Sequence, residues 1–155
     1  MAQKHRKNPV NDMVRFLATG FFVGYCPVAP GTAGTFVALL LYVILPTNPV
    51  FYWVFLLCLV VLGTLLSRKS EDIFGDDDPP PVVIDEICGY FVTMAFLPKT
   101  IPLMILGFIV FRLLDVFKLS SMRKLEKIKG GLGIMLDDIY AGMIGSLILH
   151  LIHWL

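Results

Sequence analysis

The chain has 155 residues, of which 57% are hydrophobic and only 16% are charged, and its mean hydropathy is +0.79. A soluble domain of this length has about a quarter charged residues and roughly 45–50% apolar ones. The formal net charge of +1 gives no electrostatic reason to expect a nucleic-acid partner. Composition therefore excludes an ordinary soluble domain and predicts a small integral membrane protein that forms one domain over residues 1–155.

The N-terminal stretch is basic and then apolar, as in a signal peptide, but Arg15 and Gly20 interrupt the apolar run. No small-residue cleavage pattern follows it. We therefore interpret residues 1–12 as a flexible basic terminus. The residues that follow are expected to form a re-entrant or interfacial segment.

Five apolar segments come next, and they predict an all-α membrane bundle of about five apolar helices. Their expected limits are 32–45, 50–66, 82–97, 101–117 and 130–155. Several are shorter than the roughly 20 residues that cross a bilayer perpendicularly. The connections between them are of two kinds. Two are short and contain proline (46–49 and 98–102), and two are longer and polar (67–81 and 118–131).

Charged residues are distributed unevenly between these connections. Lys99 is the one charged residue in the two proline-containing connections. Twelve of the thirteen Lys and Arg residues, and all twelve acidic residues, fall in the N-terminus, in the polar connections or at the segment ends beside them. An up-and-down path with a cytoplasmic N-terminus places these parts at the cytoplasmic face, as the positive-inside rule requires. We therefore predict a multi-pass membrane protein whose polar site faces the cytoplasm.

Two acidic pairs stand where apolar segments begin on that side, Asp85 with Glu86 and Asp137 with Asp138. Carboxylates gathered at one depth repel one another unless protons or a cation offset their charge. Their oxygens suit Mg²⁺, Ca²⁺ or Mn²⁺. The alternative for a single pair is to cap a helix at the interface. Convergence of polar groups from several helices favours a functional cluster instead.

Two further stretches offer groups that bind anions. Arg112 and Asp115 are three residues apart and share a helix face. They form either a structural ion pair or two parts of a site, in which Asp115 joins the metal and Arg112 or Lys118 holds an anion. In PGTAGT (30–35), Thr32 is an N-cap candidate for a helix whose first N–H groups are free to bind phosphate.

Taken together, these stretches resemble the phosphatidylglycerophosphatase A family. The resemblance covers about residues 20–145 and rests on four motifs in the family's order: PGTAGT (30–35), DPPPVVIDEICG (78–89), FRLLDVFK (111–118) and GGLGIMLDDIYAG (130–142). It implies Mg²⁺-dependent hydrolysis of phosphatidylglycerophosphate to phosphatidylglycerol and inorganic phosphate. It also implies a place in the cytoplasmic (inner) membrane of a bacterium. The family usually continues the third motif with proline-rich residues, whereas this chain has Leu119, Ser120 and Ser121.

The motifs and the chemistry lead to one hypothesis for the site. The expected catalytic residues are Asp85, Glu86, Asp115, Asp137 and Asp138. Four of them are expected to hold one or two Mg²⁺ ions that clamp the phosphate and activate a water: Asp85, Glu86, Asp137 and Asp138. The expected substrate-binding residues are Thr32, Gly34, Thr35, Arg112 and Lys118.

The expected partners are the phosphorylated lipid and the surrounding membrane lipids, and nothing in the sequence indicates an oligomer. The basic stretch 122–131 either attracts anionic headgroups or only sets the topology. The alternative function is a small ion-coupled transporter or carrier that uses the acidic cluster. Ionisable groups at one face and the lack of an internal repeat disfavour that alternative.

Overall fold

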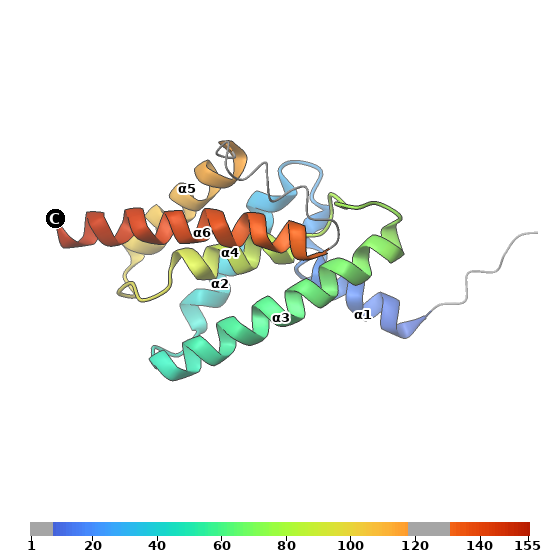
Figure 1. Cartoon of the computed structure of the whole chain (residues 1–155), viewed down its shortest axis with the longest axis horizontal. Helices are drawn as coiled ribbons and strands as arrows, with labels where there is room; N and C mark the ends of the chain where they lie inside the picture. The colour runs from blue at the N-terminus through green and yellow to red at the C-terminus, as the bar shows by residue number, and fades with distance from the viewer. Residues whose placement is uncertain (1–7, 118–130) are drawn as a thin grey trace, which may run out of the picture.

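The computed structural model describes residues 8–117 and 131–155, and these residues form helices and no strand (Figure 1). The elements are α1 (Pro9–Ala18), the short 3₁₀ helix η1 (Val23–Tyr25), α2 (Pro30–Ile44), α3 (Pro49–Phe74), α4 (Ile84–Thr93), α5 (Ile101–Phe117) and α6 (Gly131–Trp154). The prediction of an all-α fold is confirmed. Helices α2 to α6 correspond in order to the five apolar segments.

Two helices of the described part, α3 and α6, are long and apolar enough to cross a membrane. This is fewer than the five or so that the sequence predicts. The reason is length, because α2 has 15 residues and α4 has 10. At 1.5 Å per residue these helices are about 22 and 15 Å long, less than the roughly 30 Å of a bilayer's hydrocarbon core.

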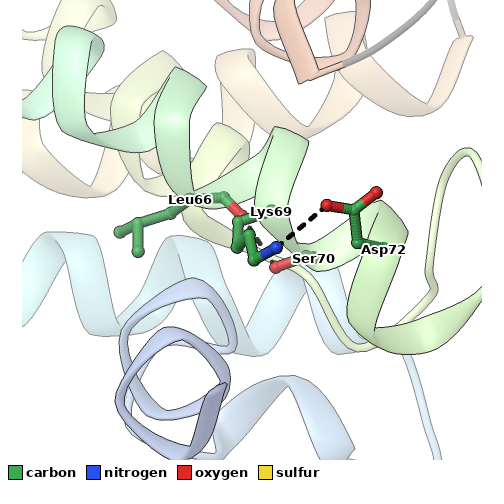
Figure 2. Close-up of polar contacts among 4 residues, drawn as sticks. All are labelled: Leu66, Lys69, Ser70 and Asp72. Carbon is green, nitrogen blue, oxygen red and sulfur yellow. Dashed lines mark hydrogen bonds and ion pairs between the residues drawn. The ribbon is translucent and has the colours of Figure 1, made fainter. Parts of the chain in front are cut away.

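Helix α3 extends further than expected, because residues 67–74 continue it instead of forming the start of a loop. Figure 2 shows this last part of the helix, where Ser70 Oγ donates to the carbonyl of Leu66 at 2.9 Å. In the same view Lys69 Nζ lies 3.0 Å from a carboxylate oxygen of Asp72. The polar residues therefore follow the helical period, and the chain leaves the helix at Gly75, whose φ of 74° is left-handed.

Residues 9–12, expected to be part of a flexible terminus, form the first turn of α1. Asn8 caps this helix by accepting a hydrogen bond from Val10 N at 3.1 Å. Pro9 occupies the first helical position, where its missing N–H costs nothing. One side of α1 packs on α3, and apolar side chains on the other side are exposed: Val10, Met13 and Phe16. Such a two-sided helix suits a membrane–water interface.

The short helix α4 lies in the middle of the bundle and packs against α2, α3, α5 and α6. Three of its side chains have no exposed surface: Cys88, Tyr90 and Phe91. A helix buried nearly all round carries apolar residues on every side, which explains why α4 is mostly apolar after its acidic first turn. Its position makes α4 the element through which the other helices are placed relative to one another.

From α2 to α6, successive helices run in opposite directions, and the two ends of this bundle differ in their chemistry. Helices α4 and α6 run side by side in the same direction, since Gly142 contacts Gly89 and Gly145 contacts Thr93. We call the end with the starts of α2, α4 and α6 the acidic end. The opposite end contains the α2–α3 and α4–α5 connections, and we call it the aromatic end.

We expect Gly142→Ala to destabilise the fold, because a Cβ there would overlap the backbone carbonyl oxygen of Gly89. A helix backbone cannot give way as a flexible side chain can, and overpacking costs about 1–3 kcal/mol. Thermal unfolding of the purified protein in detergent would measure the loss. Met143→Ala is the matched control, because the Met143 side chain is exposed and its truncation should leave the midpoint nearly unchanged. Equal midpoints for both variants would contradict the packing described for α4 and α6.

Candidate functional site

Three carboxylates meet at the acidic end of the bundle. Asp85 and Glu86 lie in the first turn of α4, and Asp138 lies in the first half of α6. One oxygen from each can be chosen so that all three lie within 4.8 Å of one another. Asp85 is only 8% exposed and Asp138 only 5%, so the group is enclosed by protein. We call these three residues the acidic triad.

Close packing of α4 against α6 produces this arrangement. A Cβ at Gly89 would overlap both the ring of Phe111 and the backbone carbonyl of Asp138, so only glycine permits the observed approach. Gly142 lies one turn further along α6, against the carbonyl of Gly89. The small residues next to the acids therefore determine how close Asp138 comes to the α4 pair.

The triad contains polar atoms that the described part of the protein does not satisfy. Asp85 Oδ1 and Glu86 Oε2 are buried and take part in no hydrogen bond with the described residues. A buried oxygen without a partner is costly, and a buried negative charge is more so. Three carboxylates at this separation would also repel one another strongly. Hard oxygen donors in this number fit a divalent cation such as Mg²⁺.

A cationic side chain from α5 and the start of α2 adjoin the triad. A Cβ at Gly31, the second residue of α2, would contact both Glu86 Oε1 and Arg112 Nη1. Arg112 forms an ion pair with Asp115, and their side chains are 15% and 13% exposed. Arg112 Nε is also buried without a hydrogen-bond partner in the described residues. The site therefore combines groups from α2, α4, α5 and α6.

The structure distinguishes among the predicted anion-binding positions on α2. Thr32 is not the N-cap, since Ala29 occupies that position and Pro30 begins the helix. Proline suits a first helical position because it has no N–H to satisfy, and the N-cap lies three residues closer to the N-terminus than expected. Thr32 consequently lies within the first turn.

The other two predicted residues of α2 have evident packing roles. Thr35 is buried, and its hydroxyl donates to the carbonyl of Gly31 at 2.8 Å. A Cβ at Gly34 would lie 2.6 Å from Cβ of Val83, so this glycine lets α2 approach the residue before α4. The substrate-binding residues predicted from the sequence did not include Gly31, which adjoins the acids. Its position between a helix-starting proline and a threonine was the available signal.

The roles of the remaining predicted residues, like those of the residues above, stay predictions. Asp137 is buried at the acidic end, but it does not belong to the group of three whose oxygens converge. Lys118 lies outside the described residues. Asp115 is placed by its ion pair with Arg112, next to the triad rather than within it.

A cluster of buried carboxylates beside an arginine and a helix start is typical of metal-assisted phosphate chemistry, and here it is built among apolar helices. Comparison with known proteins agrees. The family model of phosphatidylglycerophosphatase A matches residues 16–153, and the chain belongs to that family.

Three curated relatives cover most of the chain. A Bacteroides thetaiotaomicron protein, provisionally named a phosphatidylinositol-3-phosphatase, is 34% identical, with 89% of this chain and 92% of the relative aligned. Phosphatidylglycerophosphatase A of Escherichia coli K12 is 34% identical, covering 89% of this chain and 83% of that protein. Phosphatidylglycerophosphatase A of Haemophilus influenzae is 32% identical over 96% and 94% of the two chains. No solved structure matches the chain significantly.

We expect Asp138→Asn to weaken the binding of a divalent cation by about tenfold or more, because one charged ligand of the triad is lost. Isothermal titration calorimetry of the purified protein with Mn²⁺ would measure the change. Asp137→Asn is the matched variant, since the neighbouring acid is buried but outside the triad. Equal losses in the two variants would make Asp137 a ligand as well. Unchanged binding in Asp138→Asn would exclude the triad as the metal site.

Proposed function

We propose that this protein is a Mg²⁺-dependent lipid phosphatase that converts phosphatidylglycerophosphate to phosphatidylglycerol and inorganic phosphate. Membership of the phosphatidylglycerophosphatase A family supports the reaction and the lipid class. The observation that carries the proposal is the acidic triad, enclosed between apolar helices and joined by Arg112. This arrangement supplies both a cation site and an anion-binding side chain next to it.

In the proposed mechanism, Asp85, Glu86 and Asp138 hold the cation through the oxygens that converge in the triad. When bound, Mg²⁺ supplies positive charge that stabilises the transferring phosphoryl group and makes a water molecule more acidic. The attacking water oxygen forms a bond to phosphorus, and the bond from phosphorus to the glycerol oxygen breaks. A proton of the water passes to a carboxylate at the acidic end, and that carboxyl group then returns a proton to the departing glycerol oxygen.

Arg112 is the residue that we assign to the phosphate oxygens. Its guanidinium adjoins Gly31 at the start of α2, where the first backbone N–H groups have no partner within the helix. A planar fork of donors next to a helix N-terminus suits a phosphate monoester. Asp115 pairs with Arg112 and so orients it. Asp115 is in this proposal a positioning residue.

The proposed location is the cytoplasmic side of a bacterial inner membrane, in a multi-pass arrangement. The alternating direction of the helices from α2 to α6 supports this path, and so does the concentration of Lys and Arg that the sequence has in the N-terminus and the two polar connections. Apolar side chains that the fold leaves exposed recur at i, i+4 spacing on α5, at Ile101, Ile105, Ile109 and Leu113. A lipid-facing surface of this kind lets the acyl chains of a substrate stay in the membrane.

A phosphoinositide is the second candidate substrate, because the name of the Bacteroides relative describes a phosphatidylinositol-3-phosphatase. Both lipids present a phosphate monoester on a polyol headgroup. They differ in the bulk around the ester, which is a flexible glycerol in one and an inositol ring in the other. Rates on the two lipids under identical conditions decide between them.

We expect the detergent-purified protein to release phosphate from phosphatidylglycerophosphate with Mg²⁺, and EDTA to abolish the release reversibly. Asp138→Asn should lower kcat/KM by about a hundredfold or more, as loss of an electrostatic group that acts in the transition state does. Asp72→Asn is the control, because it removes an exposed carboxylate near the end of α3 and leaves the triad unchanged. Full activity in Asp138→Asn, or in EDTA, would overturn the proposed mechanism.

A second prediction separates binding from chemistry. Arg112→Lys should raise KM by about tenfold to a hundredfold, since a bidentate charge-assisted contact is replaced by a single point charge. Asp115→Asn should have a smaller effect in the same direction, because the arginine stays but loses its orienting partner. Steady-state kinetics on both variants would test this. A fall in kcat alone, with KM unchanged in both, would place the pair in the chemical step instead.

A further inference from the structure

A cavity of about 350 Å³ lies at the aromatic end, remote from the acidic triad along the bundle. It is formed where the α2–α3 and α4–α5 connections meet, and Tyr42, Tyr52, Trp53, Phe96 and Lys99 are among the residues that line it. This size is within the range of pockets that bind small molecules. The catalytic proposal makes no use of this cavity.

Aromatic rings form a large part of its wall. The rings of Trp53 and Phe96 are 4.7 Å apart between centroids, and those of Tyr42 and Tyr52 are 6.1 Å apart. Phe96 has a left-handed backbone with φ of 64°, which non-glycine residues seldom adopt. That conformation leaves its ring largely exposed beside Trp53. Tyrosine and tryptophan are the side chains that gather at membrane–water interfaces.

One cation lies in this wall, and it has no acidic counterpart in the described residues around it. Lys99 Nζ donates to the carbonyl of Leu45 and lies 5.5 Å from the centre of the Tyr42 ring. The ammonium group has three donors, so the carbonyl accounts for one of them. The sequence has no acidic residue between Asp12 and Glu71, nor between Glu86 and Asp115. The positive charge of Lys99 therefore has no carboxylate near it in sequence.

We propose that this cavity binds a membrane phospholipid with a negatively charged headgroup, its phosphate beside Lys99 and its acyl region against Trp53 and Phe96. The apolar aromatic wall complements the acyl region of such a lipid, and the uncompensated cation complements its negatively charged headgroup. A zwitterionic lipid carries a positive group that Lys99 would repel. The proposal depends on the membrane placement given above and does not depend on the phosphatase reaction.

The chain contains two tryptophans, Trp53 and Trp154, which permits a direct measurement. In a Trp154→Phe background, Trp53 is the sole tryptophan and it lines the cavity. The protein is placed in bilayers of phosphatidylcholine with EDTA, and lipids with brominated acyl chains are titrated in. Brominated phosphatidylglycerol should quench Trp53 at about fivefold lower mole fraction than brominated phosphatidylcholine, the effect of one lysine near an anionic lipid.

Three variants test the role of the cavity. Lys99→Gln keeps a donor for the Leu45 carbonyl but removes the charge, and it should abolish the preference. Lys99→Arg should retain it. Thr47→Phe adds bulk to the cavity lining without touching the lysine, and it should also reduce the preference. Lys69→Gln is the control, because this exposed lysine lies on α3 and is paired with Asp72.

Equal quenching by the two lipids in the parent protein would overturn the proposal and leave the membrane placement intact. A preference that survives both Lys99→Gln and Thr47→Phe would also overturn it. Quenching by neither lipid would refute the membrane placement itself, and the proposal with it. If Lys99→Gln does not fold, the comparison of Lys99→Arg with Thr47→Phe still decides whether the preference depends on the cavity. Phosphate release in the parent protein is measured separately and does not bear on these outcomes.

Discussion

The close approach of α4 and α6 is the constraint on which the rest of this structure depends. Gly89 and Gly142 remove the side chains that would separate the two helices, and each faces backbone of the other helix. The approach brings Asp138 beside Asp85 and Glu86, within a protein interior that is mostly apolar. Burying three carboxylates together is unfavourable without a compensating charge. The packing that makes the bundle tight therefore also creates the demand for a compensating charge, which in the proposed function is a divalent cation.

Helix α4 is short, and its neighbours compensate for its length. A helix of 10 residues cannot cross a bilayer alone, and α4 is instead surrounded by four neighbours that shield its ends. The irregular backbone just before α4 is held in place by contacts with the N-terminal segment. Val83 N donates to the carbonyl of Ala18 at 2.9 Å, and a Cβ at Gly24 would overlap the carbonyl of Pro81. Backbone that leaves a helix inside a membrane protein needs such internal partners.

The two ends of the bundle have different chemistry. The acidic end combines the triad with Arg112 and the start of α2, a combination suited to a doubly charged phosphate group. The aromatic end has rings, prolines and the single cation Lys99. The exposed apolar side chains of α3 and α5 lie between these ends. In the two proposals made above, this separation of reactive and interfacial chemistry gives a small chain two places at which to contact lipid.

The sequence by itself determined the class of fold, the order of the five apolar helices and the side on which the acids gather. These properties depend on local composition, on periodicity and on the placement of Lys and Arg, all of which can be determined from the sequence. It also pointed to Asp85, Glu86 and Asp138 as candidates. It did not distinguish Asp138 from Asp137, because adjacent residues on a helix point about 100° apart and only the facing helix selects one.

The tertiary structure alone decided the remaining points. Gly31 adjoins Glu86 and Arg112, whereas Gly34 faces Val83 and the hydroxyl of Thr35 returns to its own helix. All three belong to the same short motif, and the rotation of α2 against its neighbours assigns their roles. The polar end of α3 likewise lies against α6, where a Cβ at Gly131 would overlap the backbone of Arg68. Contacts between distant segments depend on how helices pack, and the local sequence does not specify that packing directly.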